Sequence, residues 1–556
     1  NAPSLRKHVD NDLSKEDIKY LSESHTLEPL VTALKAVSKE KPADPLLKVI
    51  QNLEIQARPN FQNQYTLDLC GLTVEYNRNV RLVTGPIVGD VTSETANIMV
   101  EVVGKEKLCK VTCNVFERES KTMVQQIQKD CHSRRTRCFH LEGLQENTHY
   151  ICVFSGLSKG TSTRAYARIK TKSATPKVFK IVAVSCDRPT NLYHGQINPW
   201  KLLGEQIESV DCMLHLGDQV YMKMYTTHEI DDLMETLAKE YDSATPEQQA
   251  LMMKRGRELS RRKYREVFGM LEQQKIYRHS SHLMIWSDND VANDFTSLKN
   301  EDGSQAYHPA FLQCAMEVYR EYQRLLWDHE CDGDLPVTDS PLEEWHSHIY
   351  GEIGIFLIDM RGNRINGKGV QLDAPLVSDR QWQDLEEMME LEHLKVLVIC
   401  SEIPFVTDPP STVKESAEKI PFLADHWAYN DAELVKLLEM IFTWKSSKPE
   451  REVILLGGDV HSGSTSVIKD AATGLEIQHV VTSPITNAAS PFYSELSGSI
   501  NERFSYEHTS LGQDFRNWAE ISIDLEGKTD VRAKLVKVST DIYEEMEWCS
   551  SDEEQP

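Results

Sequence analysis

Several hallmarks of well-known protein classes are missing from this chain of 556 residues. It contains no Asn-x-Ser/Thr sequence, which N-glycosylation requires, and its twelve cysteines form no CxxC pair. It also has no apolar run long enough to cross a bilayer, so we expect no membrane span. The missing glycosylation sequence favours a cytoplasmic protein. Secretion stays an alternative, because the chain begins without Met and a signal peptide could already have been removed.

Positive charge is scarce, since 61 Lys and Arg residues stand against 86 Asp and Glu residues and give a formal net charge of -25. A protein of this sign repels nucleic acids, so no nucleic-acid binding is expected unless a bound cation reverses the local charge. The hydrophobic content of 40% and the charged content of 26% are typical of a soluble globular protein. At this length we expect two or three domains.

The first third of the chain changes its periodicity once. Residues 1–80 are predicted to be helical, because "SKEDIKYLSE" and "EPLVTALKAVSK" place apolar residues three and four positions apart. Residues 81–173 alternate instead, in "TANIMVEVV", "CKVTCNVF", "CFHLEGL" and "YICVFSG", which predicts a small β-sandwich. Within it, "LEGLQENTHYICVF" resembles the end of a fibronectin type III module, with Tyr150 as the tyrosine corner. Cys131 and Cys138 are the best disulfide candidates.

Residues 178–535 are predicted to form a layered α/β domain. Six continuous apolar runs, each typical of a strand buried on both faces, alternate there with helical stretches: "FKIVAVSC", "CMLHLGD", "LMIWSD", "IGIFLIDM", "VLVIC" and "VILLGGD". A charged helical insertion is expected at 228–268, and the tail at 536–556 is acidic and expected to be disordered.

Polar side chains follow four of these predicted strands at the point where each strand ends. Taken singly, each fits an ordinary role in a core or a turn. If the four strands share one sheet, however, these side chains converge on one rim, where ligands of open α/β sheets bind. Several carboxylates together with a thiol, a phenol and an imidazole there indicate a metal site. The candidate ligands are Cys186, Asp218, Tyr221, Asp288, Asp459 and His461.

The blocks "SC", "GDxxY", "DND" and "GDVH", in this order, resemble the PhoD-like (alkaline phosphatase D) family of calcineurin-like metallophosphatases. The similarity extends to "AMEVYREYQ", "IDMRGNR" and "VTSPIT" and covers about 80–535. The resemblance implies an αββα metallophosphatase sandwich preceded by the fibronectin III-like β-sandwich. It also implies a phosphoric ester hydrolase, a phosphatase or phosphodiesterase, in which a metal-bound hydroxide attacks phosphate mono- or diesters.

The resemblance further implies an Fe(III) ion with a Ca(II) ion beside it, with Zn(II) or Mn(II) as alternatives. Cys186, Asp218, Tyr221 and His461 correspond to the iron ligands, Asp218 also bridges the two ions, and Asp288 and Asp459 face the second ion. The chemistry agrees, because thiolate and phenolate suit trivalent iron and carboxylates suit calcium. The ionised ligands carry about five negative charges, which the two ions together would balance.

The block "SDND" departs from the family pattern, which commonly reads "DDHE" or "DDHD" here. Ser287 and Asn289 therefore stand where Asp and His are usual, and Asn289 cannot protonate a leaving group as an imidazolium does, although its amide can hydrogen-bond a phosphoryl oxygen. His194 could supply that proton instead, or be a surface histidine. Arg188 and Arg361 could hold the phosphate, or be structural ion-pair partners.

Two classes of function remain open. The intact ligand blocks favour a phosphoesterase acting on a phosphate ester substrate. The altered block favours, more weakly, a catalytically weakened metallophosphatase fold with a binding or regulatory role. The sequence alone does not decide between monoesters and diesters, and it does not give the oligomeric state.

Overall fold

The structure is a computed structural model that describes residues 76–162, 164–192, 196–222, 229–293, 295, 308–331, 344–362, 375–417 and 419–538. The predicted helical segment up to residue 75, His194 and the tail from residue 539 lie outside the described residues. Two compact units are distinguished. The first contains 76–82, Val102–Ser133 and Cys152–Tyr166, and the second contains Val83–Glu101, Arg134–Ile151 and 167–538. No helix in the described ranges is long and apolar enough to cross a membrane.

The strands between residues 80 and 170 form two sheets, as a small β-sandwich requires. All four alternating segments singled out in the sequence are strands. The sheets have the orders β1-β2-β5 and β4-β3-β6-β7. Their strands are β1 (Val80–Val91), β2 (Ala96–Gly104), β3 (Leu108–Glu117), β4 (Met123–His132), β5 (Thr136–Leu141), β6 (His149–Ser155) and β7 (Tyr166–Lys170), with the short helix α6 (Lys159–Ser162) before β7.

Two local expectations in this region have opposite outcomes. The hydroxyl of Tyr150 accepts a hydrogen bond of 2.8 Å from the backbone N–H of Gln145, five residues upstream, which is the geometry of a tyrosine corner. The expected disulfide is wrong, because Cys131 and Cys138 are both buried thiols.

The second unit contains two larger sheets, of orders β10-β9-β8-β19-β20 and β11-β12-β13-β14-β16-β15-β18-β17. All six predicted apolar runs are strands, and three fall in each sheet. The first three are β8 (Val178–Val184), β9 (Cys212–Leu216) and β10 (Ser281–Ile285), and they run parallel to one another. The other three are β12 (Ile353–Ile358), β13 (Val396–Ser401) and β14 (Glu452–Gly457), also parallel.

The remaining strands pair mainly antiparallel at the edges of these sheets. They are β11 (His346–Tyr350), β15 (Gly463–Asp470), β16 (Glu476–Val481), β17 (Ser497–Ser499), β18 (Phe504–Gly512), β19 (Arg516–Asp524) and β20 (Asp530–Val538). Strand β16 lies between β14 and β15, pairing parallel with β14 and antiparallel with β15.

Side chains along the central strands alternate between two cores. Ile355 and Leu357 of β12 share one buried cluster with Ile181 of β8, so this core lies between the two sheets. Phe356 and Ile358 belong to another cluster, which contains apolar side chains of α12 (Asp379–Met389) and α14 (Asp431–Ser446). Because neighbouring residues of a strand point to opposite faces, these helices cover the outer face of the eight-stranded sheet.

The five-stranded sheet is covered in the same way. Val182 of β8 packs with Trp200 of α7 (Pro199–Leu203) and Ile276 of α10 (Leu271–Tyr277). The order helix, sheet, sheet, helix confirms the predicted αββα sandwich.

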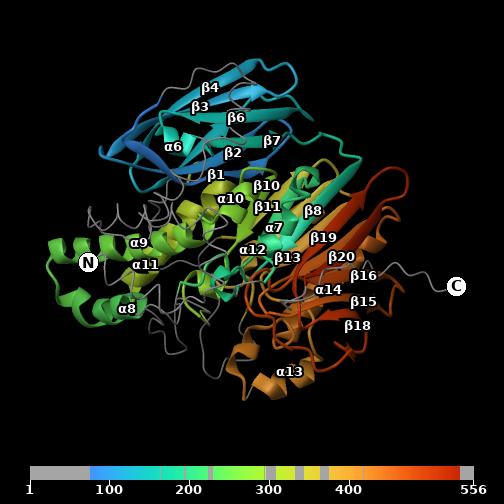
Figure 1. The fold of residues 1–556 in the computed structure, drawn as a ribbon. Helices are drawn as coiled ribbons and strands as arrows, with labels where there is room; N and C mark the ends of the chain where they lie inside the picture. The colour runs from blue at the N-terminus through green and yellow to red at the C-terminus, as the bar shows by residue number, and fades with distance from the viewer. Residues whose placement is uncertain are drawn as a thin grey trace, which may run out of the picture. The chain divides into compact units, whose positions relative to one another are not determined.

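The predicted insertion is helical. It contains α8 (Glu229–Glu240) and α9 (Pro246–Phe268), and α9 lies beside α11 (Pro309–Tyr322) (Figure 1). Arg261 on α9 forms a two-pronged ion pair with Glu321 on α11, with both distances 2.7 Å. The other described helical segments are α13 (Pro410–Ala417), η1 (Pro189–Asn191), η2 (Ile207–Ser209), η3 (Tyr241–Ser243), η4 (Asp288–Asp290), η5 (Arg324–Leu326) and η6 (Pro421–Asp425).

His479 on β16 is a fully buried histidine whose ring meets the ring of Phe405 edge-on, with centroids 5.8 Å apart. Among the described residues neither of its ring nitrogens has a hydrogen-bond partner. Burial, assisted by His508, lowers the pKa of His479 to about 3. Folding therefore keeps this imidazole neutral.

We expect His479 to make the protein less stable in acid. In the unfolded chain His479 binds a proton near pH 6.5, whereas in the folded protein it does not do so until about pH 3. The free energy of unfolding is therefore unaffected by His479 above pH 6.5 and decreases as the pH falls below 6.5. The loss is at most about 1.4 kcal/mol per pH unit. Urea unfolding of the wild type and His479→Leu at pH 7 and pH 5 measures it. The variant should lose less stability between these pH values, and equal losses would contradict the account.

Candidate metal centre

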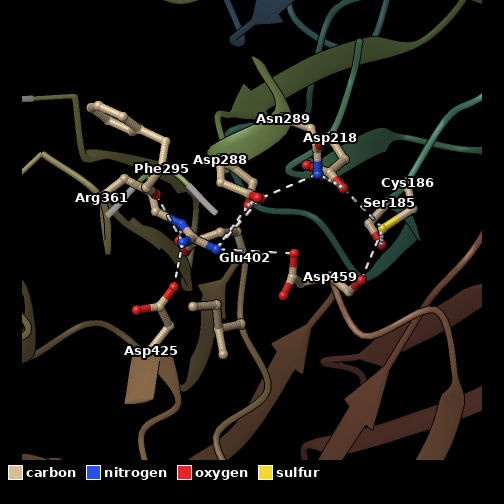
Figure 2. Close-up of polar contacts among 12 residues, drawn as sticks. Ser185, Cys186, Asp218, Asp288, Asn289, Phe295, Arg361, Glu402, Asp425 and Asp459 are labelled. Carbon is tan, nitrogen blue, oxygen red and sulfur yellow. Dashed lines mark hydrogen bonds and ion pairs between the residues drawn. The ribbon is translucent and has the colours of Figure 1, made fainter. Parts of the chain in front are cut away.

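All six predicted ligands lie just beyond the ends of four strands. Cys186 follows β8, Asp218 and Tyr221 follow β9, Asp288 follows β10, and Asp459 and His461 follow β14. The condition considered for their convergence, one shared sheet, is not met, because β14 belongs to the eight-stranded sheet. The residues still converge, since the two sheets pack against each other. Figure 2 shows Cys186, Asp218, Asp288 and Asp459, one from the end of each strand, close together.

The structure brings these residues into two adjacent donor groups. Possible ligand atoms of Cys186, Asp218 and His461 all lie within 4.8 Å of one another. The same holds for Asp218, Asp288 and Asp459, so Asp218 belongs to both groups. The Tyr221 hydroxyl lies 3.1 Å from Nε2 of His461, which places the phenol beside the first group. A carboxylate shared by two donor groups is what a pair of neighbouring cations requires.

The backbone is held in an unusual conformation at four of these residues. The φ angles of Cys186, Asp218, Asp459 and His461 are 56°, 57°, 66° and 54°. Residues other than glycine rarely adopt such angles, and they do so mainly where the surrounding structure enforces them, often at functional sites. The strand ends are therefore shaped to present these side chains.

The glycines of the two "GD" pairs allow a close approach between strand ends. A Cβ on Gly217, whose φ is 83°, would lie 2.5 Å from Cβ of Ser287. A Cβ on Gly458 would lie 2.6 Å from the carbonyl oxygen of Leu216. Only glycine fits at either position, and this close packing brings Asp218 and Asp459 together.

Without a cation, this site disfavours its own ionised groups. Burial, and then the neighbouring Asp288 and Asp459, raise the pKa of Asp218 well above its usual value. Burial and Asp218 raise the pKa of Cys186 and of Tyr221 in the same way. Bound cations would reverse this effect, because they favour the deprotonated ligands.

The residues fit a pair of metal ions. Oδ1 of Asp218 is buried and has no hydrogen-bond partner among the described residues, although its Oδ2 accepts from the Asn289 amide. A buried oxygen left in this state is costly unless another ligand contacts it. The Cys186 thiol accepts a hydrogen bond of 3.2 Å from the Ser483 hydroxyl, which favours the thiolate.

The "DND" stretch is a 3-10 turn in which each residue has a different task. Asp288 turns its carboxylate into the second donor group. The Asp290 carboxylate accepts backbone N–H groups of Asp218, Val220 and Ser287, at 3.1, 3.2 and 2.9 Å. Asp290 thus fixes the loop that carries Asp218. The sequence did not indicate this role, because it showed Asp290 only as the third polar residue in the stretch.

Asn289 lies between the two carboxylates. Its side-chain N–H groups donate to Oδ2 of Asp218 at 3.2 Å and to Oδ1 of Asp288 at 3.4 Å. It is 8% exposed and carries no ionisable proton. Asn289 therefore holds the carboxylates of two candidate ligands in place.

The two arginines differ. Arg361 is 2% exposed and lies among carboxylates, so the structure favours its ion-pair role over phosphate binding. Arg188 is partly exposed, and its guanidinium lies 5.4 Å from the centroid of the Tyr221 ring, beside the first donor group. It remains a candidate for contact with phosphate.

Sequence reasoning missed Asn487. Its side-chain N–H groups donate to the Tyr221 oxygen at 2.7 Å and to Nε2 of His461 at 3.0 Å. The available signal was its position directly after "VTSPIT", although an asparagine there is also typical of a turn.

The chain was compared with known proteins. Residues 181–534 match the family model described as PhoD-like phosphatase. A solved structure described as "Structure of PhoD" aligns with a TM-score of 0.54 and 15% identity, over 87% of this chain and 92% of that chain. At that identity the likeness shows the fold alone. A calcium-binding mutant of Bacteroides uniformis beta-glucuronidase 2 reaches a TM-score of only 0.15, with 8% identity over 83% of this chain and 60% of that one, and carries no argument. No curated protein matches significantly.

Proposed function

Because this chain belongs to the PhoD-like phosphatase family, we propose that it is a metal-dependent phosphoesterase that hydrolyses phosphate mono- or diesters. The observation that carries the proposal is the sharing of Asp218 between two donor groups, with one of its buried oxygens left without a hydrogen-bond partner among the described residues. When bound, two cations would neutralise phosphoryl charge and acidify a water molecule for attack on phosphorus.

The donor types support Fe(III) in the first group and Ca(II) in the second. Cys186, Tyr221 and His461 offer sulfur, phenol and imidazole donors, which transition metals bind well, whereas Asp288 and Asp459 offer only carboxylates, which calcium prefers. Zn(II) and Mn(II) are the alternative ions for these donor groups.

Three side chains in and around the donor groups would serve the metals or the substrate. Burial lowers the pKa of His461 to about 4, so its imidazole is neutral at pH 7 and offers a lone pair rather than a proton. Arg188 would contact a phosphoryl oxygen, and its partial exposure and its position 5.4 Å from the centroid of the Tyr221 ring support this role. Asn289 would hold the carboxylates of Asp218 and Asp288 in position through its two amide hydrogen bonds.

The direct test is hydrolysis of a matched pair of nitrophenyl phosphates, one monoester and one diester. We expect hydrolysis of at least one of them, its loss after chelation of the metals, and its return when metals are added back. The ratio of the two rates assigns monoesters or diesters. A protein that keeps both ions and hydrolyses neither would contradict the proposal and favour the binding or regulatory role.

Tyr221 provides a spectroscopic test of the iron assignment. A phenolate bound to Fe(III) gives a visible charge-transfer absorption, so the concentrated oxidised protein should be coloured. Tyr221→Phe should remove this band, and Tyr150→Phe, which lies outside the site, should keep it. A colourless and iron-free protein that still hydrolyses nitrophenyl phosphate would exclude Fe(III) and leave Zn(II) or Mn(II).

A further inference from the structure

One buried arginine lies among four carboxylates beside the second donor group. Arg361 is 2% exposed, and its nearest acidic groups come from four separate segments of the chain (Figure 2). The distances from its guanidinium nitrogens to carboxylate oxygens are 2.8 Å for Glu402, 3.0 Å for Asp425, 3.6 Å for Asp288 and 4.0 Å for Asp459. Two of these carboxylates belong to the second donor group and two do not.

The hydrogen-bonding capacity of Arg361 is almost fully used by the protein. A guanidinium has five N–H groups. Nε donates to Glu402, Nη1 donates to Asp425 and to the carbonyl oxygen of Phe295, and Nη2 donates to the hydroxyl of Ser287 at 3.3 Å. The Nη2 end is also the one that approaches Asp288 and Asp459. A substrate phosphate would have to displace these partners.

The carboxylates closest to Arg361 also disfavour phosphate binding by its guanidinium. Glu402 is 0% exposed and Asp425 is 8% exposed, and both lie closer to the guanidinium than the carboxylates of the donor group do. Burial raises the pKa of Glu402 well above its usual value, so Glu402 serves chiefly as a hydrogen-bond acceptor and Asp425 as the close anionic partner of Arg361. A phosphate dianion would have to compete with Asp425 for the guanidinium. Glu402 and Asp425 also fix the plane of the guanidinium, because they contact two different nitrogens.

We infer that Arg361, held by Glu402 and Asp425, is a positioning residue that orients Asp288 and Asp459 for the second cation and does not bind the substrate phosphate. The inference rests on the proposed two-cation centre. Nη2 of Arg361 lies 3.6 Å from a carboxylate oxygen of Asp288 and 4.0 Å from one of Asp459, so a guanidinium held in one plane gives both carboxylates a fixed neighbour beside the second donor group. Groups that orient metal ligands in this way typically contribute a factor of about 10 to 100 to metal affinity.

The test is the affinity of the second site for Ca²⁺ in Arg361→Gln, measured by calorimetry on protein that retains its first ion. We expect the dissociation constant to rise about 10- to 100-fold, with the content of the first ion unchanged. The inhibition constant of inorganic phosphate, measured at saturating Ca²⁺, should stay within about two-fold of the wild type. If Arg361 only stabilised the fold, its substitution would change the Ca²⁺ affinity, the content of the first ion and the phosphate inhibition constant together.

Arg261→Gln is the matched control, because it removes another buried arginine with a bidentate carboxylate partner, on α9 rather than at the site. It should leave the Ca²⁺ affinity unchanged. Asp425→Asn is measured in parallel, because it loosens Arg361 without removing a donor-group residue and keeps the inference testable if Arg361→Gln does not fold. It should weaken Ca²⁺ binding in the same direction.

Two results would overturn the inference. If Ca²⁺ binds Arg361→Gln and Asp425→Asn with wild-type affinity, Arg361 does not position the ligands. If phosphate inhibition weakens in Arg361→Gln while Ca²⁺ binding is intact, the arginine binds phosphate instead. Failure of the proposed function is a separate outcome, because wild-type protein would then bind fewer than two ions or hydrolyse no phosphate ester.

Discussion

Asp218→Asn is expected to abolish phosphate ester hydrolysis and to weaken the binding of both cations together. Asp218 is the one carboxylate present in both donor groups, and the amide that replaces it removes the negative charge that two cations would share. Because even groups that only orient ligands contribute about 10- to 100-fold to metal affinity, the loss of a shared ligand should be at least as large for each ion. Elemental analysis after dialysis measures both ions at once.

Asp459→Asn is the matched control for this prediction. Asp459 belongs only to the second donor group, so its variant should lose the second ion and keep the first. Because Asp218 is buried, its substitution could disturb the fold, so unfolding of the variant in urea is measured before its metal content is determined. Retention of both ions by a folded Asp218→Asn would show that Asp218 is not the shared ligand.

Asn289→His is expected to accelerate hydrolysis of alkyl phosphates far more than hydrolysis of nitrophenyl phosphates. Asn289 carries no ionisable proton, so an alkoxide leaving group receives no help from this position in the wild type. An imidazole that retains the position of the amide could donate that proton, and a general acid contributes about 10² to 10⁴-fold. Nitrophenolate leaves without protonation and should gain little. Rates for one alkyl and one nitrophenyl phosphate are compared in both proteins.

The competing explanation assigns the proton to His194. His194→Ala separates the two possibilities, because it should leave the wild-type ratio of alkyl to nitrophenyl rates unchanged if no histidine serves as the acid. Equal wild-type rates for both substrates, together with loss of the alkyl rate in His194→Ala, would give the role to His194. Asn289 contacts two ligand carboxylates, so metal content is measured in Asn289→His to exclude an indirect effect.

The fold could be predicted from the sequence where burial leaves a local pattern. Continuous apolar runs identified the six central strands, because strands covered on both faces need apolar residues at every position. The division of these strands between two sheets left no such pattern. Strand β14 reads like β9, yet it lies in the facing sheet, and only long-range packing decides this.

The site shows the same division. Residue type and position after a strand singled out the candidate ligands, and the structure brings them together. The residues that hold them were not predictable, because their tasks depend on contacts between segments far apart in the chain. Asp290 binds the backbone of the loop around Asp218, and Glu402 binds a guanidinium 41 residues away in sequence. In the sequence, the first is another acid in a turn and the second is a polar residue after a strand.

The most direct test of the two-cation centre is hydrolysis of nitrophenyl phosphate measured against the number of metal ions bound per chain, starting from protein stripped by a chelator and reloaded in steps. The account predicts two ions per chain at saturation and little hydrolysis until the second donor group is filled. Full hydrolysis by protein that carries one ion per chain, or none, would contradict it.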